Sequence, residues 1–286
     1  MNINKKSEKI CNLKLNNQTS SNFNDLNFTK KNNFPKCKLK RISQKELNEN
    51  KNLLKKYSRN NLKLAGLTNN LWNPSSTLKV GFDFSYYCVP SESISSLKDQ
   101  IINLANKWCN HGSINLEVSN DKQNCDIIIG FKPYIGTFSY LGIQSKIIIN
   151  KGKNSMNIDP SWATTLWNID KEQTNFYSLY LQSAILHEFG HAFGLIHEHQ
   201  RADRPFNWNI DWMKSNEDKL GLNNWQQVVS NYIEKEPMSN LGYGDFDFNS
   251  IMCYNWDKNA TIEKIGNKIN YVLSEKDKSD FSLLYP

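Results

Sequence analysis

Residues 187 to 198 restrict the fold and chemistry of this 286-residue chain more than any other stretch. They read His-Glu-Phe-Gly-His-Ala-Phe-Gly-Leu-Ile-His-Glu. The spacing of four between His187 and His191 is about one helical turn, so both imidazoles leave one face and can bind one ion. Gly194 lacks a Cβ and predicts a sharp turn that brings His197 back as a third ligand. Three protein ligands leave one coordination position open, which is typical of a catalytic zinc site.

Glu188 follows the first ligand directly, where its carboxylate is expected to reach a water activated by the metal. A bare His-Glu-x-x-His match also arises by chance on amphipathic helices. Gly194, His197 and Glu198 at fixed spacing make chance a poor explanation. We expect His199 to lie on the surface or beside the ligands, and not to be a ligand itself.

A second motif, Ser250-Ile251-Met252-Cys253-Tyr254, places Met252 55 residues after His197. Together the two motifs resemble the metzincin metallopeptidases and, within them, the astacin family. The resemblance implies that Met252 forms an apolar floor under the metal. It also implies that Tyr254 is a further zinc ligand that moves away during turnover. Cys253 stands where animal members usually have His, and we expect it to pack into the wall of the site.

The resemblance covers residues 72–286 and implies an α+β, zincin-like catalytic domain. Such a domain has a twisted sheet, long helices and one Zn²⁺ in a cleft between two subdomains. The implied activity is that of a zinc endopeptidase acting on proteins and peptides, with Glu188 as general base. An edge strand near Tyr140 would pair with the substrate. Lys268 would line the pocket for the residue after the scissile bond and favour an acidic side chain there.

Hydrophobic periodicity predicts the main elements of this domain. We expect an active-site helix at 175–194, an aromatic-packed region around Trp208, Trp212 and Trp225, and a final helix that starts at Ser274 and packs through Phe281, Leu283 and Leu284. The other expected elements are strands at 78–84, 125–131 and 155–158, a β-rich run at 146–150 and a core helix at 93–109.

The charge is unevenly distributed along the chain. Residues 1–70 carry 16 Lys and Arg against 4 Asp and Glu, or +12, so the remaining residues carry −5 of the total of +7. We interpret residues 1–71 as a basic N-terminal extension, partly disordered or a pro-segment. Residues 43–58 are expected to form a short helix capped by Ser43 with Glu46. No stacking or finger pattern supports nucleic-acid binding.

Two segments of the extension partly match known inhibitory latches. Phe23-Asn24-Asp25 approaches the motif of astacin pro-segments but lacks its Gly. Pro35-Lys36-Cys37 faintly resembles the thiolate latch of matrix metallopeptidases, although the residues after it do not match. A plain flexible tail is the alternative.

The sequence shows neither an apolar signal-peptide core nor a stretch long enough to span a membrane. We therefore expect a monomer that is intracellular or secreted by a leaderless route, as a bacterial effector would be. Its cysteines are expected to be reduced, with a Cys109–Cys125 bridge as the open alternative. Hydrolysis of a small amide and a binding module with a dead site are the competing functions. Zinc content and casein cleavage would distinguish them.

Overall fold

The computed structural model describes residues 37–57, 70–86, 91–160, 175–222, 224–236 and 245–286. The chain divides into two compact units, Met1–Phe34 and Pro35–Pro286, and every described residue lies in the second. The prediction of partial disorder in residues 1–71 therefore falls largely outside the described residues, and the Asp25 segment falls wholly outside them. The boundary at residue 71 stays a prediction.

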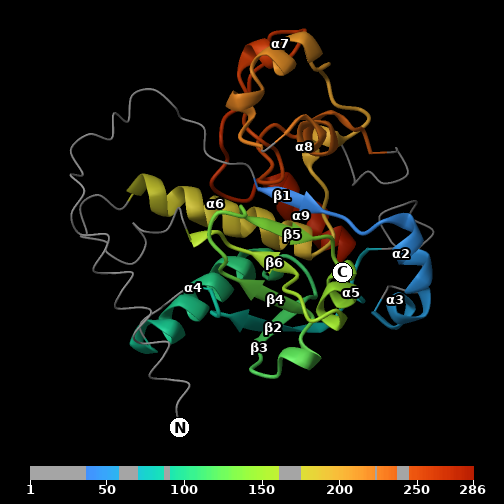
Figure 1. Cartoon of the computed structure of the whole chain (residues 1–286), viewed down its shortest axis with the longest axis vertical. Helices are drawn as coiled ribbons and strands as arrows, with labels where there is room; N and C mark the ends of the chain where they lie inside the picture. Colours follow the sequence, from blue (N-terminus) through green and yellow to red (C-terminus); the bar gives the residue numbers. More distant parts are fainter. Residues whose placement is uncertain (1–36, 58–69, 87–90, 161–174, 223, 237–244) are drawn as a thin grey trace. The chain divides into compact units, whose positions relative to one another are not determined.

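A six-stranded mixed sheet with the order β1-β5-β6-β4-β2-β3 forms the framework of the second unit (Figure 1). Only the β5–β6 pair is antiparallel among these described strands. The apolar run of β4 is buried throughout, as expected for a strand with both faces covered. The strands are β1 (Lys38–Lys40), β2 (Thr77–Asp83), β3 (Asn115–Val118), β4 (Ile127–Gly130), β5 (Phe138–Tyr140) and β6 (Met156–Asn157).

Two long helices, α4 (Ser91–Cys109) and α6 (Asn175–Ala192), pack against each other and share the main core with the sheet. Trp108 of α4 is fully buried, and its indole N–H donates to the Leu186 carbonyl of α6 at 2.9 Å. Both helices, and the strands expected at 78–84, 125–131 and 155–158, are confirmed to within a few residues. The predicted α+β zincin-like fold is confirmed.

A second core cluster, rich in aromatic side chains, lies in the segment with α7 (Ile210–Ser215) and α8 (Trp225–Val228). Trp208 is buried within it, and Trp212 and Trp225 pack against it, as predicted. The region is drawn in orange in Figure 1, with α7 far from the strands of the sheet.

Two local predictions are wrong. The isoleucine-rich run at 146–150 belongs to a helix, α5 (Gln144–Asn150), not to a strand. Ile147 and Ile148 are buried in a cluster with Ile42, so packing overrides their intrinsic preference for β structure. The final helix, α9 (Glu275–Leu284), begins at the predicted Ser274 cap and packs through Phe281 and Leu284 as predicted, but Leu283 is 50% exposed.

Part of the basic N-terminal extension is folded onto the sheet and α5. The predicted helix at 43–58 is present as two short helices, α2 (Gln44–Glu49) and α3 (Lys51–Tyr57), with Ser43 as the cap. Cys109 and Cys125 are both free thiols, so the bridge between them is not formed. No helix in the described part of the chain is long and apolar enough to cross a membrane.

Candidate metal and active site

Helix α6 and the turn after it bring the three predicted ligands together. Single ring nitrogens of His187, His191 and His197 lie within 4.8 Å of one another, and all three side chains are buried. The helix ends where Gly194 adopts a φ of +97°, a conformation that favours glycine. The Gly194 N–H donates to the His191 carbonyl at 2.8 Å, and the chain then returns toward His187 and His191. The turn predicted from the sequence is thus present.

The hydrogen bonds of two of these rings fix their tautomers. The Nδ1 atoms of His191 and His197 lie 2.8 Å from the Leu195 carbonyl and 2.9 Å from Oε1 of Gln200. Both partners are acceptors, so both Nδ1 atoms carry the proton. The two Nε2 atoms, 3.1 Å apart, then face each other as lone pairs. Two facing lone pairs repel unless a cation lies between them, so the donor set fits a metal ion.

The orientation of Gln200 is itself determined by its neighbours. Its side-chain N–H₂ donates to the carbonyls of Ser230 at 2.8 Å and Glu234 at 3.2 Å, so the amide oxygen faces His197. Such support of a ligand from behind commonly accompanies a zinc-binding histidine. Burial, followed by the charges of neighbouring histidines, lowers the pKa of His197 well below its usual value. The ring is therefore neutral, as a metal ligand must be.

Glu188 is fully buried beside the ligands. Burial raises the pKa of its carboxyl well above the usual value. The Cys37 thiol, the Lys38 backbone and the charge of Lys40 act in the opposite direction. A raised pKa makes the carboxylate a stronger base, which suits proton transfer during a reaction.

Met252 packs directly against the ligand helix. It is 3% exposed, and a Cβ added to Gly190, between the first two ligands in sequence, would lie only 2.3 Å from its Sδ. The Met252 carbonyl accepts the Glu198 N–H at 3.0 Å, which ties this segment to the residue after His197. The placement agrees with the predicted floor under the metal, although the role itself stays a prediction.

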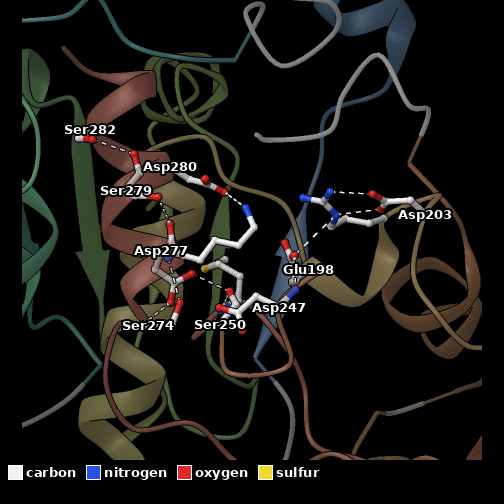
Figure 2. A network of polar contacts seen from close by, with 12 residues as sticks. Glu198, Asp203, Asp247, Ser250, Ser274, Asp277, Ser279, Asp280 and Ser282 are labelled. Carbon is white, nitrogen blue, oxygen red and sulfur yellow. Dashed lines mark hydrogen bonds and ion pairs between the residues drawn. The ribbon is translucent and has the colours of Figure 1, made fainter. Parts of the chain in front are cut away.

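The segment before Met252 is held by a buried carboxylate that the sequence analysis did not single out. Asp277 accepts the Ser250 hydroxyl at 2.6 Å, the Ile251 N–H at 2.8 Å and the Ser274 N–H at 2.9 Å (Figure 2). The Ile251 carbonyl in turn lies 2.8 Å from Nδ1 of His187. Asp277 thus helps to position the first ligand through one peptide unit.

Tyr254 lies beside the ligands, with its ring centroid 4.4 Å from that of His197. Its hydroxyl donates a hydrogen bond to the carbonyl of Cys37. The roles predicted for Tyr254, as metal ligand and in catalysis, stay predictions. His199 is fully buried and its ring stacks on His197 at 4.9 Å, so it lies beside the ligands and not on the surface. Cys253 is buried, as expected.

Residues 38–40 lie along the edge of β5, and Cys37 lines a pocket with His187 and Tyr254. The sequence analysis did not predict this arrangement. Strand β1 extends the sheet beyond β5 in parallel register, from Lys38 opposite Phe138 to Lys40 opposite Tyr140 (Figure 1). The predicted edge strand at Tyr140 is therefore present and is covered by the chain's own segment. The partial Pro35-Lys36-Cys37 latch match was the only sequence signal for it.

A pocket opens beside Cys37. Its wall includes Cys37, Tyr180, His187, Ile251, Tyr254, Ile269 and Asn270. Lys268, predicted to line the pocket for the residue after the scissile bond, is exposed and precedes two wall residues without belonging to the wall described here. Its role in specificity stays a prediction.

The model of the Astacin peptidase family matches residues 180–279, which hold all three histidines, Glu188, Met252 and Tyr254. One structure of myroilysin aligns with a TM-score of 0.64 and 24% identity, covering 78% of this chain and 98% of that one. A crystal structure of myroilysin aligns with a TM-score of 0.52 and 22% identity, covering 87% of this chain and 90% of that one. The zinc-protease hatching enzyme of the medaka fish, Oryzias latipes, aligns with a TM-score of 0.48 and 17% identity, covering 80% of this chain and 98% of that one. No curated protein sequence matches this chain.

The predicted astacin-like zinc metallopeptidase is confirmed by the match over residues 180–279, and zinc is the metal that this class uses.

Proposed function

We propose that this chain is a zinc endopeptidase in which Glu188 is the general base. The observation that carries the proposal is the convergence of two buried imidazole lone pairs, 3.1 Å apart, next to the buried carboxyl of Glu188. His187, His191 and His197 would hold the ion. When bound, zinc lowers the pKa of a water toward 7 and polarises a carbonyl.

The chain's own residues supply the proton transfers. Glu188 would take a proton from the attacking water and pass it to the leaving amine, which suits a carboxyl whose pKa is raised by burial. The Tyr254 hydroxyl already donates to a peptide carbonyl in the cleft, that of Cys37. It would donate in the same way to the substrate carbonyl as negative charge develops there.

The cleft suits an extended peptide better than a small amide. Strand β5 pairs with a three-residue strand along its open edge, and the Lys38 N–H donates to the Thr137 carbonyl at 3.0 Å. A substrate that adds to the same edge would gain main-chain hydrogen bonds independent of its sequence. This supports protein and peptide substrates and disfavours the small-amide alternative.

We also propose that residues 37–42 keep the uncut chain inactive. The segment covers the β5 edge, its Cys37 carbonyl engages Tyr254, and its thiol lies at Glu188. The described metal-ligand group contains the three histidines and not Cys37, so inhibition would act through the covered β5 edge and Tyr254. These contacts argue against the alternative that residues 37–42 are part of a plain flexible tail.

The test uses full-length protein with a sequence-specific protease site placed within residues 58–69, folded first and cut afterwards. Cutting should release casein hydrolysis, and Glu188→Gln should lower it about 100-fold or more without loss of zinc. Glu117→Gln, at an exposed carboxylate on β3, is the control and should be unchanged. Cut, zinc-loaded protein that cleaves neither casein nor a peptide library would overturn the proposed function.

A further inference from the structure

The side chains of residues 38–41 show what kind of residue the cleft accepts. Lys38, Lys40 and Arg41 are basic, and each meets a group suited to a cation on the surrounding wall. We call this surface the cation-binding wall, and it consists of Gly136, Phe138, Tyr140, Asp159 and Glu236.

Arg41 makes the strongest of these contacts, an ion pair with Glu236. The Glu236 side chain is 8% exposed, so the pair is partly withdrawn from water, where charges interact more strongly than on an open surface. The Glu236 backbone N–H donates to the Gln200 carbonyl at 2.7 Å. Because Gln200 also bonds to His197, the carboxylate has a fixed place relative to the metal site.

The two lysines contact the wall on the side of the sheet. The Lys40 ammonium lies 3.4 Å from the centroid of the Phe138 ring and 5.8 Å from that of Tyr140, a cation–π arrangement. The Lys38 side chain runs over Gly136, where a Cβ would lie 3.2 Å from its Nζ. Burial lowers the pKa of Lys38, and the charge of Asp159, which is 2% exposed, acts in the opposite direction and favours the ammonium.

We infer that the cation-binding wall selects substrates with basic residues on one side of the scissile bond, with Glu236 as the main specificity determinant. The inference rests on the proposed function, because a substrate would replace residues 37–42 in the cleft. The same sites along a sheet edge can contact the side chains of a parallel or an antiparallel strand. A peptide that pairs antiparallel to β5 would place its residues before the scissile bond on this wall. The pocket lined by Ile269 and Asn270 includes Cys37 but none of residues 38–41, so a separate preference there is compatible.

The test uses the full-length protein that is folded and then cut within residues 58–69. Quenched fluorescent peptides carry Arg, Lys, norleucine or Glu at each of four positions before the scissile bond. We expect kcat/KM to be about tenfold higher for Arg or Lys than for norleucine at one position or more, which corresponds to about 1.4 kcal/mol. Glutamate should be the poorest residue there.

Glu236→Gln should reduce the advantage of Arg to about twofold and leave the norleucine peptide unchanged. Glu236→Arg should make the glutamate peptide the better substrate. Glu117→Gln, at an exposed carboxylate on β3, is the control and should keep the full preference. Zinc content is measured for each protein to show that the site is intact.

A wild-type enzyme that cleaves the peptides without any preference for basic residues overturns the inference and leaves the proposed function standing. This wild-type result does not depend on how well any variant folds. A preference that survives Glu236→Gln in a zinc-loaded protein also overturns the role of Glu236. Absence of cleavage of every peptide and of casein would instead refute the proposed function.

Discussion

Removal of the Asp277 carboxylate should affect both stability and metal binding. Asp277→Ala leaves two buried donors, at Ser250 and Ile251, and a part-buried one, at Ser274, without their acceptor. Hydrogen bonds to a charged group contribute about 1.5–3 kcal/mol each, and the cost of burying the carboxylate offsets part of that sum. Burial does raise the pKa of Asp277, which shows that this cost is present. We expect a net loss of about 3 kcal/mol in the free energy of unfolding.

For a domain of this size such a loss lowers Tm by about 6–12 °C. The assay is thermal unfolding of the metal-free protein followed by circular dichroism, with zinc affinity measured by chelator competition. Affinity should fall about tenfold or more, because Ile251 orients His187. The matched control is Asp280→Ala on the same helix, which removes only the ion pair with Lys276 and should cost about 0.5 kcal/mol. Equal Tm values for the two variants would refute the reasoning.

Three further changes probe the site directly. His191→Ala should abolish both stoichiometric zinc binding, measured by metal analysis, and casein cleavage; a variant that kept its zinc would show that the ligand set is wrong. Tyr254→Phe should lower kcat about tenfold or more and change zinc affinity little, because three histidines hold the metal while the phenol acts on the transition state; the reverse pattern in steady-state kinetics and chelator competition would contradict this. Gly190→Ala should cost about 1–3 kcal/mol in urea unfolding, because its Cβ would lie 2.3 Å from the Met252 sulfur, and an unchanged midpoint would disprove the close contact.

The sequence predicted the elements that carry strong periodic or spacing signals. The ligand helix, its end at Gly194 and the return of His197 follow from helical geometry and from one glycine, and all are present. The Ser274 cap could be predicted because capping depends on neighbouring residues alone. The buried contacts of Asp277 with Ser250 and Ile251 could not, since they join residues 26 and 27 positions apart.

The elements that the sequence analysis missed or predicted wrongly also depend on tertiary contacts. Lys-Leu-Lys gives no β signal, and β1 forms only because β5 offers a free edge. The isoleucines of α5 are β-branched, yet packing against Ile42 holds them in a helix. Gly190 occupies a variable position of the zinc motif, so its close contact with Met252 could not be predicted from the pattern.

In the proposed mechanism, latency and specificity depend on the same groups. The segment that covers the cleft uses the β5 edge, Tyr254 and Glu236, which are the groups that the proposed substrate would use. A change at Glu236 therefore weakens two complexes at once, that with the inhibitory segment and that with a basic substrate. Glu236→Gln should raise the residual activity of the uncut chain toward neutral peptides while it lowers the preference of the cut enzyme for basic ones. A purely structural defect would lower the activity of the uncut chain and that of the cut enzyme together. A gain of activity in the uncut chain combined with a lost preference in the cut enzyme therefore indicates shared recognition.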